Sequence, residues 1–255
     1  MTTISVVIPS YNDEVFLRNC LAALAAQLRP ADEIIVVDNA STDATADVAR
    51  AGGARVVVEP LHGIWPATSA GFDAATGDVI ARLDTDSVPP ADWLLRIEAK
   101  LAASPEVDVV TGPGDFYDCG PVTALLGRYV YIGGYFWAIG LWLDHPPIFG
   151  SNFAMRRPVW LDTRGVVHRA LGDVHDDLDF SLHLAPSVTV AYERTLRVGI
   201  SARPFGTWRG FRRRLRWAYR TLSLHLPDQS PWRLRMNKRA WLAQSGGGKP
   251  RKTSA

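Results

Sequence analysis

Cysteine is scarce in this sequence, with only Cys20 and Cys119 among 255 residues. Two cysteines are too few for a disulfide framework, and these two match no metal-binding spacing. A small secreted scaffold held by disulfides is therefore excluded, and a reducing compartment is indicated. No basic run precedes the first apolar stretch at Ile4, so we expect no signal peptide.

Long hydrophobic runs are also missing. Residues 129–143 carry no charge, but this run of 15 is shorter than the about 20 residues of a membrane-spanning helix, and Arg128 bars its extension. Its Tyr and Trp content is typical of the water–lipid interface. A helix buried against a sheet, or folded over an acceptor site, explains the same residues, and both interpretations stay open at this point.

Two nucleotide-binding signatures are absent. No G-x-G-x-x-G turn follows the first predicted strand, and no G-x-x-x-x-G-K-[ST] phosphate loop occurs anywhere. A nicotinamide dinucleotide site is therefore disfavoured. The apolar content of 47% is ordinary for a globular protein, and a chain of this length predicts one sizeable domain with a tail.

Acidic residues are nearly absent from the end of the chain. Residues 200–255 carry 14 Lys and Arg but one acidic residue, a net charge of +13. Residues 1–199 carry 14 basic and 25 acidic residues, a net charge of −11. This asymmetry indicates an acidic body and a basic tail that meets an anionic partner.

Apolar strands alternate with segments of helical periodicity in the first part of the chain. The expected elements are strand Ile4–Ile8, helix Glu14–Leu28, strand Ile34–Val37, helix Asp43–Arg50, strand Arg55–Val58, helix Ala67–Ala75 and a strand that leads into Asp84. Continuous apolar strands between helices predict an α/β fold with a mostly parallel central sheet and helices on both faces.

The stretch Gly77–Asp86 is predicted to be a short buried strand that ends in two carboxylates. Side chains alternate along a strand, so Asp84 and Asp86 leave on the same face, roughly 6–7 Å apart. Two anions at that spacing repel by about 2–3 kcal/mol at an effective dielectric of ~20, which favours a cation beside them. Oxygen ligands of this kind suit magnesium or manganese. Taken alone, the pattern favours an ordinary polar strand end, and only the neighbouring motifs reverse that interpretation.

Polar groups follow two further predicted strands, at Pro9–Asp13 and at Asp38–Asn39. Ligands of open parallel sheets bind at the carboxyl ends of the strands, where these groups meet the Asp84–Asp86 pair. A nucleotide held by aromatic stacking and carboxylates, with a metal on its diphosphate, fits this set of residues.

These motifs together resemble the family 2 glycosyltransferases, which are inverting enzymes with the GT-A fold. The matching segments cover most of residues 4–200 and are 7–14, 36–43, 77–86, 150–157 and 175–179. The resemblance implies a nucleoside-diphosphate-sugar donor and a hydroxyl acceptor. It assigns donor binding to Pro9, Tyr11, Asn12, Asp38 and Asp84, and a Mg²⁺ or Mn²⁺ ion to Asp86 together with Asp84. One departure is residues 67–71, Ala-Thr-Ser-Ala-Gly, which lack the arginine that family members often carry near the diphosphate.

The second half of the domain is expected to hold the catalytic base. The segment His175–Asp179 offers three carboxylates at the start of a predicted helix. Helix capping without chemistry is one interpretation of Asp176 and Asp177. The resemblance implies that Asp177 is the base and Asp176 its neighbour, because an inverting transfer needs a carboxylate to accept the acceptor proton. The nearby His168, His175 and His183 are expected to be surface or supporting residues rather than metal ligands.

Two further segments are candidates for substrate contacts. The resemblance places Asn152 at the rim of an acceptor pocket, although a strand edge solvated by Arg156 and Arg157 explains that segment equally simply. Membrane-bound polysaccharide synthases of the family carry Gln-x-x-Arg-Trp, and here Arg216 and Trp217 match while Arg213 replaces Gln. Arg216 is therefore a candidate donor contact and Trp217 a candidate acceptor contact. The alternative is an amphipathic helix with its apolar side toward the core, at Trp208, Phe211, Leu215, Ala218 and Leu222.

The sequence thus predicts a GT-A-like domain at residues 1–200, with donor binding in 1–115 and the acceptor and base in 116–200. A basic helical extension at 201–243 and a disordered tail at 244–255 would follow. The expected function is an inverting, metal-dependent glycosyltransferase acting on a glycan or lipid-linked acceptor of the cell envelope. We expect it in the cytoplasm, with an anionic membrane surface as a further partner.

Two alternatives stand beside this interpretation. A nucleotidyltransferase of related fold would release diphosphate, but it has no need of the carboxylates Asp176 and Asp177. A nucleic-acid-binding protein would use the Arg-rich tail, but the acidic body and the lack of a recognisable nucleic-acid module argue against it, so no nucleic acid is expected as a partner.

Overall fold

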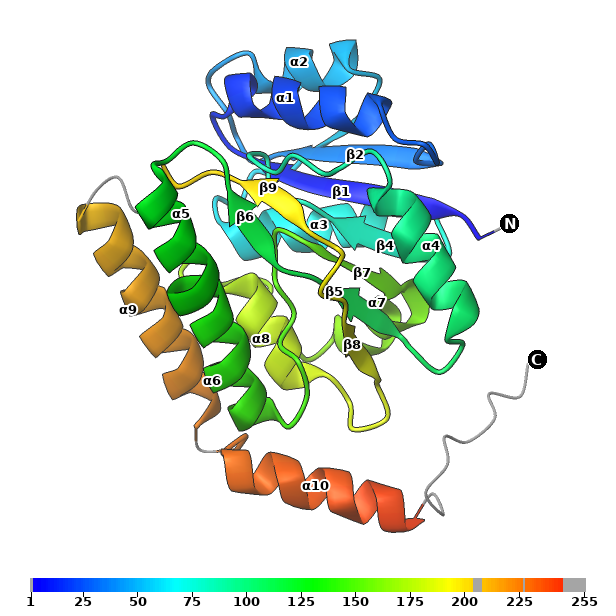
Figure 1. Ribbon diagram of the computed structural model, residues 1–255, viewed down its shortest axis with the longest axis vertical. Coiled ribbons are helices and arrows are strands. Elements are labelled where there is room, and N and C mark those ends of the chain that lie inside the picture. Colours follow the sequence, from blue (N-terminus) through cyan, green and yellow to red (C-terminus); the bar gives the residue numbers. More distant parts are fainter. Residues whose placement is uncertain (1, 204–207, 227, 245–255) are drawn as a thin grey trace.

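The structure is a computed structural model that describes residues 2–203, 208–226 and 228–244 (Figure 1). Its elements are β1 (Ile4–Ser10), α1 (Glu14–Ala25), β2 (Glu33–Asp38), α2 (Thr45–Ala51), β3 (Arg55–Val58), α3 (Ile64–Ala74), β4 (Val79–Arg82), α4 (Trp93–Ala103), β5 (Val109–Thr111), β6 (Gly114–Phe116), α5 (Pro121–Leu126), η1 (Gly127–Ile132), α6 (Gly133–Leu143), β7 (Phe153–Arg156), α7 (Arg157–Thr163), α8 (Asp176–His183), β8 (Val190–Tyr192), β9 (Val198–Ile200), α9 (Trp208–His225) and α10 (Pro231–Gln244).

A mostly parallel sheet forms the centre of the molecule, as predicted. Its strand order is β3-β2-β1-β4-β7-β5-β8, and β7 runs antiparallel to both of its neighbours. The pairs β1–β2, β1–β4 and β2–β3 are parallel. The carboxyl ends of β1, β2 and β4 therefore meet at one edge of the sheet, as the sequence analysis expected. A second small sheet pairs β6 with β9.

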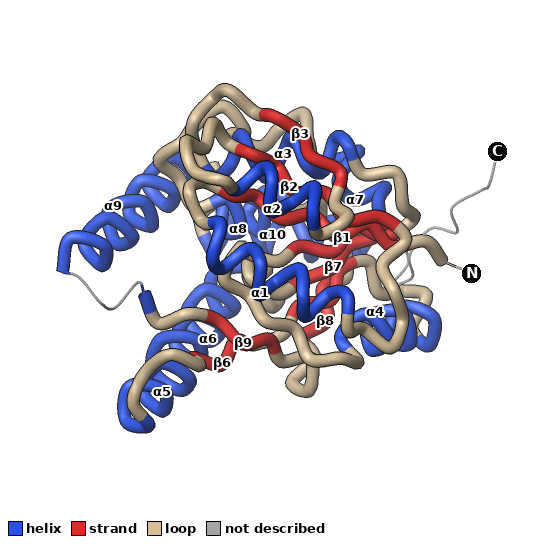
Figure 2. Tube along the Cα trace, turned by 90° about the horizontal axis from the view of Figure 1, so that it is seen from above, coloured by secondary structure: helices blue, strands red, loops and turns tan. Residues whose placement is uncertain are grey.

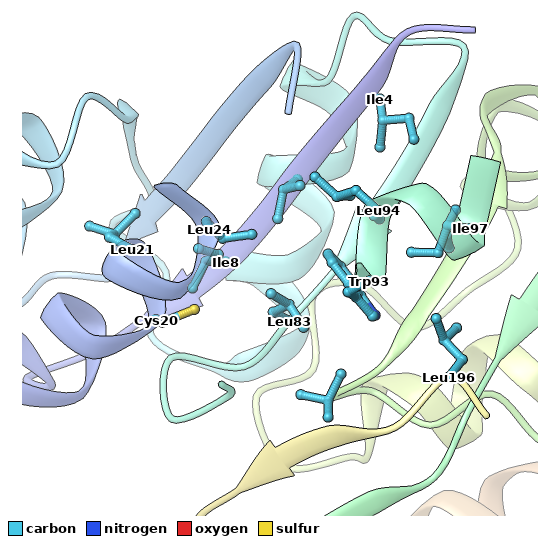
Figure 3. Packing of buried hydrophobic residues seen from close by; sticks show 14 of the residues in the cluster. Ile4, Ile8, Cys20, Leu21, Leu24, Leu83, Trp93, Leu94, Ile97 and Leu196 are labelled. Carbon is cyan, nitrogen blue, oxygen red and sulfur yellow. The ribbon is translucent and has the colours of Figure 1, made fainter. Parts of the chain in front are cut away.

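Helices cover both faces of the sheet (Figures 1 and 2). On one face, α1, α2 and α4 pack on side chains such as Ile4 and Ile8 of β1 (Figure 3). On the other face, α3, α7 and α8 pack on Val7 and Ile80, and the buried rings of Trp65 and Trp160 belong to this core. Successive β1 side chains enter opposite cores because side chains alternate along a strand.

Several helix boundaries differ from the predicted ones; α2 covers Thr45–Ala51 instead of Asp43–Arg50, and two larger differences have a visible cause. Helix α3 begins at Ile64, three residues before the predicted start, because Pro66 lies in its first turn, where a missing N–H breaks no helical hydrogen bond. Helix α1 ends at Ala25 instead of Leu28, since the Leu28 N–H donates to the carbonyl of Ala91 in the turn before α4. Both differences arise at helix ends, where local patterns are weakest.

Residues 121–143 form one helical rod, because α5, η1 and α6 follow one another without a break (Figure 1). The aromatic run at 129–143 is neither wholly buried nor wholly exposed. Ile132 and Leu143 are buried in the core, whereas the side chain of Trp137 is 74% exposed. Within the part of the chain that the structure describes, every helix is too short or too polar to cross a membrane.

The predicted basic extension contains α9 and α10. The tail predicted to be disordered lies outside the described residues from position 245 onward. Contacts join α9 to α8 and α10 to α6. The apolar side predicted for α9 is correct for Ala218 and Leu222, which are half-buried and line a cavity, and wrong for Trp208, which is exposed; Leu215 lines the same cavity but is itself largely exposed. The side chain of Phe211 is not among those described.

Candidate active site

A cavity of about 620 Å³ lies at the carboxyl edge of the sheet. Its floor carries the Asp84–Asp86 pair from the end of β4 and the Asp176–Asp177 pair from the start of α8. Side chains of η1, α6 and α9 form its walls. The fold therefore brings the two acidic motifs into one space, although they are far apart in the sequence.

Arg82, the last residue of β4, connects the two acidic motifs. One nitrogen, Nη2, lies 2.8 Å from Asp84 Oδ1 and 3.0 Å from Asp176 Oδ2. The side chains of Arg82 and Asp176 are buried, so these two charges lack water and depend on each other, whereas Asp84 stays partly exposed to solvent. The predicted strand through Asp86 is longer than the observed one, because β4 ends at Arg82 and the chain turns at Thr85–Asp86, where the Ser87 N–H donates to the Asp84 carbonyl. The acidic pair was visible in the sequence, but the ion pair of Arg82 with α8 was not.

Asp86 lies beside a second arginine. Arg203 Nη2 is 3.1 Å from Asp86 Oδ2, and Arg203 Nη1 is 2.6 Å from Asp13 Oδ1. Burial and the neighbouring charge of Asp84 raise the pKa of Asp86 to about 6, although Arg203 opposes the shift. The charge of Asp84 thus acts in the direction expected from the sequence, since it disfavours the ionised form of Asp86. Sequence reasoning missed Arg203, which no local pattern links to the site.

Asp176 and Asp177 have different surroundings. Asp176 is buried, accepts a hydrogen bond of 2.7 Å from the Thr68 hydroxyl and pairs with Arg82. Burial raises its pKa, while Arg82 opposes the shift. Asp177 lines the cavity and is half-buried, with Oδ2 2.9 Å from the Gly150 N–H and Oδ1 2.8 Å from the Leu178 N–H. Both carboxylates line the cavity, but among the described residues the hydrogen-bond donors to Asp177 are main-chain N–H groups, whereas Asp176 is held by Thr68 and Arg82.

Gly150 is required at its position. A Cβ there would collide with Nη1 of Arg82 and would lie 3.1 Å from Asp177 Oδ2. Glycine therefore lets the main chain approach both charged groups closely enough for its N–H to reach Asp177. The next residue, Ser151, donates its hydroxyl proton to Asp84 Oδ2 at 2.5 Å.

The predicted donor-binding residues divide into two groups. Pro9, Tyr11 and Asp84 line the cavity, and the Tyr11 ring lies with its centroid 4.3 Å from that of His62. Asn12 and Asp38 are not among the lining residues. Asn12 Oδ1 accepts from the Thr42 N–H, and Asp38 Oδ1 accepts from the Ser41 N–H, so both side chains stabilise the loop after β2. Their neighbours Asp13 and Asn39 line the cavity in their place.

The structure corrects the prediction that Asn152 lies at the rim of an acceptor pocket. Its side chain is fully buried. The Nδ2 group donates to the carbonyls of Pro113 and Leu196, and Oδ1 accepts from the indole of Trp93. The amide is therefore committed to holding strands and loops together, because a buried polar group must keep its hydrogen bonds.

Only one of the two residues of the Arg-Trp motif in α9 reaches the cavity. Trp217 lines the cavity, with its ring 6.0 Å from that of His175. Arg216 is exposed and does not line the cavity, whereas Arg213 and Arg214 do. A helix turns by about 100° per residue, so neighbouring positions cannot all face one ligand. Arg213 is the residue that stands where the motif has Gln.

The residues around Asp86 fit a hard divalent cation. Asp84 and Asp86 offer only oxygen donors, which Mg²⁺ and Mn²⁺ prefer. The guanidinium of Arg203 pairs with Asp86 and Asp13 in this structure, so a metal ion at Asp86 would take the place of that guanidinium. Asp86, assisted by Asp84, is the residue that would hold the ion.

The strand order and the carboxylate-lined edge define a GT-A-like α/β fold. A mannosyltransferase of Pyrobaculum calidifontis, solved in complex with GDP-Man and Mn²⁺, has the same fold with a TM-score of 0.62. The likeness covers 98% of this chain and 76% of that chain at 21% sequence identity. At this identity it shows the fold alone.

Sequence comparison shows the family. A sequence model described as Glycosyl transferase family 2 matches residues 5–163, and the chain belongs to this family. An uncharacterized glycosyltransferase of Mycobacterium tuberculosis is 43% identical over 109 residues, which are 43% of this chain and 47% of that protein. The undecaprenyl-phosphate 4-deoxy-4-formamido-L-arabinose transferase of Pseudomonas fluorescens is 34% identical over 107 residues, 38% of this chain and 32% of that protein. The chain thus spans less than half the length of these curated relatives.

Proposed function

We propose that this protein is an inverting glycosyltransferase that moves a sugar from a nucleoside-diphosphate sugar to a hydroxyl acceptor. One observation carries the proposal. The cavity holds the Asp84–Asp86 pair and a separate carboxylate, Asp177, on one floor, with Arg82 between the two motifs. A direct displacement needs this division, because cationic stabilisation of the leaving diphosphate and proton removal from the acceptor occur on opposite sides of the sugar.

The reaction follows from the groups that line the cavity. Tyr11 and Pro9 would contact the nucleoside at the end of β1, and Asp84 its ribose. Asp177 would accept the proton of the acceptor hydroxyl while the oxygen forms a bond to the anomeric carbon. The bond from that carbon to the diphosphate oxygen breaks in the same step, and its electron pair leaves with the diphosphate. No covalent sugar–enzyme intermediate is needed.

A Mg²⁺ or Mn²⁺ ion held by Asp86 and Asp84 would supply positive charge to the leaving diphosphate. Mn²⁺ in the mannosyltransferase structure supports this assignment. Arg213 and Arg214 line the cavity as further cations and would partly replace the arginine missing from residues 67–71.

A screen of nucleotide sugars tests the proposed activity. With Mn²⁺ or Mg²⁺ present, we expect release of nucleoside diphosphate from one donor class and a product whose anomeric configuration is opposite to that of the donor. A nucleotidyltransferase would instead release inorganic diphosphate from a nucleoside triphosphate and a sugar phosphate. Separate assays for nucleoside diphosphate and for inorganic diphosphate distinguish the two functions. Release of inorganic diphosphate without nucleoside diphosphate would contradict the proposal.

Two surfaces of the molecule support a lipid-linked acceptor. The rod at residues 121–143 exposes apolar side chains at helical spacing, namely Val122, Leu125, Leu126, Tyr129, Val130, Trp137 and Leu141. Helix α9 exposes Arg212, Arg213, Arg216 and Arg220. The cavity lies between these elements, since both contribute to its walls. An apolar patch of this extent is typical of a binding surface, and each basic residue near an anionic membrane contributes about 1 kcal/mol.

We therefore expect the full chain to bind vesicles that contain anionic lipid. Co-sedimentation should weaken with added salt, because the contribution of α9 is electrostatic, and it should also weaken in Trp137→Ser. Leu28→Ser is the matched control, since Leu28 is similarly exposed on a different part of the surface. A protein that stays in the supernatant at low salt would remove the reason for favouring a lipid acceptor, while leaving the proposed transfer reaction untouched.

A further inference from the structure

Three histidines and an aspartate meet outside the cavity. His168, Asp179, His183 and His225 each offer one potential ligand atom, and these atoms all lie within 4.8 Å of one another. The cluster joins three segments, because His168 precedes α8, Asp179 and His183 belong to α8, and His225 is the last residue of α9. None of the four lines the cavity, so the proposed transfer reaction leaves them without a role.

Asp179 is oriented with one oxygen toward the histidines. Its Oδ2 accepts from the indole of Trp65 at 2.7 Å and from the His168 N–H at 2.9 Å. Its Oδ1 lies 2.7 Å from His168 Nδ1, 3.2 Å from His225 Nε2 and 3.7 Å from His183 Nδ1. The carboxylate is fully buried. Three imidazole rings therefore surround one oxygen of a buried carboxylate, and hydrogen bonds to the other oxygen fix the orientation of that carboxylate.

His225 is oriented in the way that metal-bound histidines usually are. Its Nδ1 lies 2.6 Å from the carbonyl oxygen of Thr221, so Nδ1 carries the proton and donates it to that oxygen. Its Nε2 lies 3.2 Å from Asp179 Oδ1, which can only accept, and 3.4 Å from His183 Nδ1, so Nε2 also donates to Asp179 here and a bound metal would take the place of that proton. A hydrogen bond from the other ring nitrogen to a main-chain carbonyl fixes the tautomer and orientation of metal-binding histidines.

The spacing of these atoms matches a small tetrahedral ion. Zinc–nitrogen distances of about 2.0–2.1 Å place neighbouring ligand atoms roughly 3.3 Å apart. The separations around Asp179 Oδ1 and His225 Nε2 are 2.7–3.7 Å and lie on both sides of that value, whereas the four potential ligand atoms spread over up to 4.8 Å, so a bound ion would draw the imidazoles together. His183 needs the largest adjustment, because its Nδ1 now donates to the main-chain oxygen of Asp179 at 2.8 Å and would exchange that contact for the ion.

Contrary to the expectation from the sequence for His168 and His183, we propose that these two residues, Asp179 and His225 bind one divalent transition metal of the zinc class, at a site separate from Asp84 and Asp86. Imidazole nitrogen selects zinc, cobalt or nickel over magnesium. Four protein ligands and no open position are typical of structural sites. The metal would fasten the end of α9 to α8, and α9 carries Arg213, Arg214 and Trp217 into the cavity. The proposal depends on no sugar or nucleotide.

Cobalt titration of the full chain tests the site, with Co²⁺ as a coloured substitute for zinc. After treatment with chelator, we expect one equivalent of Co²⁺ to give the intense visible absorption of four-coordinate cobalt, and Zn²⁺ to abolish it by displacement. Zinc at about 100 times its dissociation constant should raise Tm by roughly 5–10 °C, because the metal binds only the folded chain. Both measurements are independent of catalytic activity.

Four variants locate the metal. His225→Gln and His168→Gln should each lose the cobalt bands or weaken cobalt binding at least ~10-fold, and the half-exposed His168 gives a result even if the buried His225 variant fails to fold. His145→Gln, which removes a histidine outside the cluster, and Asp86→Ala should both keep the bands. A wild-type protein without these bands and without a zinc-dependent Tm would overturn the proposal and leave a metal-free hydrogen-bond network. Bands lost only in Asp86→Ala would overturn it as well.

Discussion

Asp177→Asn is expected to lower kcat by at least ~10²-fold and by up to ~10⁴-fold, with donor affinity nearly unchanged. Asparagine keeps the shape of the side chain and can still accept from the Gly150 N–H, but it cannot take a proton from the acceptor hydroxyl. The loss should therefore appear in kcat and in kcat/KM for the acceptor. Steady-state kinetics together with donor binding by calorimetry measure both quantities.

Asp162→Asn is the matched control for this variant. Asp162 is an exposed residue of α7, so the same change of charge there should leave kcat unaltered. Asp179 would be a poor control, although it is close in sequence, because its carboxylate is fully buried and hydrogen-bonded to Trp65 and His168. If Asp177 only caps α8, its replacement should cost about 1 kcal/mol of stability and leave turnover intact. A fast Asp177→Asn enzyme would contradict the assignment of the base.

Asp86→Ala is expected to abolish metal-dependent donor binding and turnover, and excess chelator should do the same to the wild-type protein. The expected loss of rate is ~10²-fold or more, because a metal contributes several kcal/mol of charge stabilisation to a leaving diphosphate. Manganese binding followed by calorimetry, and turnover with and without chelator, provide the measurements.

The variant Arg203→Gln tests whether Asp86 acts by binding a metal or by forming its ion pair with Arg203. The variant removes the cation at Asp86 and Asp13 but keeps both carboxylates. If a divalent ion binds at Asp86, this variant should bind manganese at least as tightly as the wild-type protein, because no guanidinium competes for the carboxylate. Two results would contradict a metal at Asp86. One is full activity of the wild-type protein in excess chelator, and the other is an equal loss of manganese binding in Asp86→Ala and Arg203→Gln.

Much of the fold and part of the site could be predicted from local sequence patterns. Alternating apolar strands and helices identify the parallel sheet, and the polar residues after Ile8, Val37 and Leu83 locate the ligand-binding edge. These predictions succeed because strand periodicity and chain direction determine which edge each strand end reaches. The family also followed from these motifs, and the match over residues 5–163 confirms it.

The role of an individual polar side chain depended on its surroundings in the folded chain. Asn152 looks like a pocket residue in sequence, yet packing of Trp93, Pro113 and Leu196 around it makes it a buried hydrogen-bonding group. Arg216 matches a known motif, yet the phase of α9 turns it to solvent. A sequence motif specifies residue types, whereas burial and helix phase determine which of them reach the cavity.

The sequence by itself determined the α/β architecture, the acidic edge of the sheet and the charge asymmetry, because each depends on residues that are neighbours along the chain. Only the tertiary structure decided the long-range partners. Arg82 meets Asp176, Arg203 meets Asp86, and His225 meets Asp179. No periodicity or spacing encodes such contacts, since they exist only after hydrophobic burial has packed α8 against the sheet, α9 against α8, and the chain after β9 beside the site.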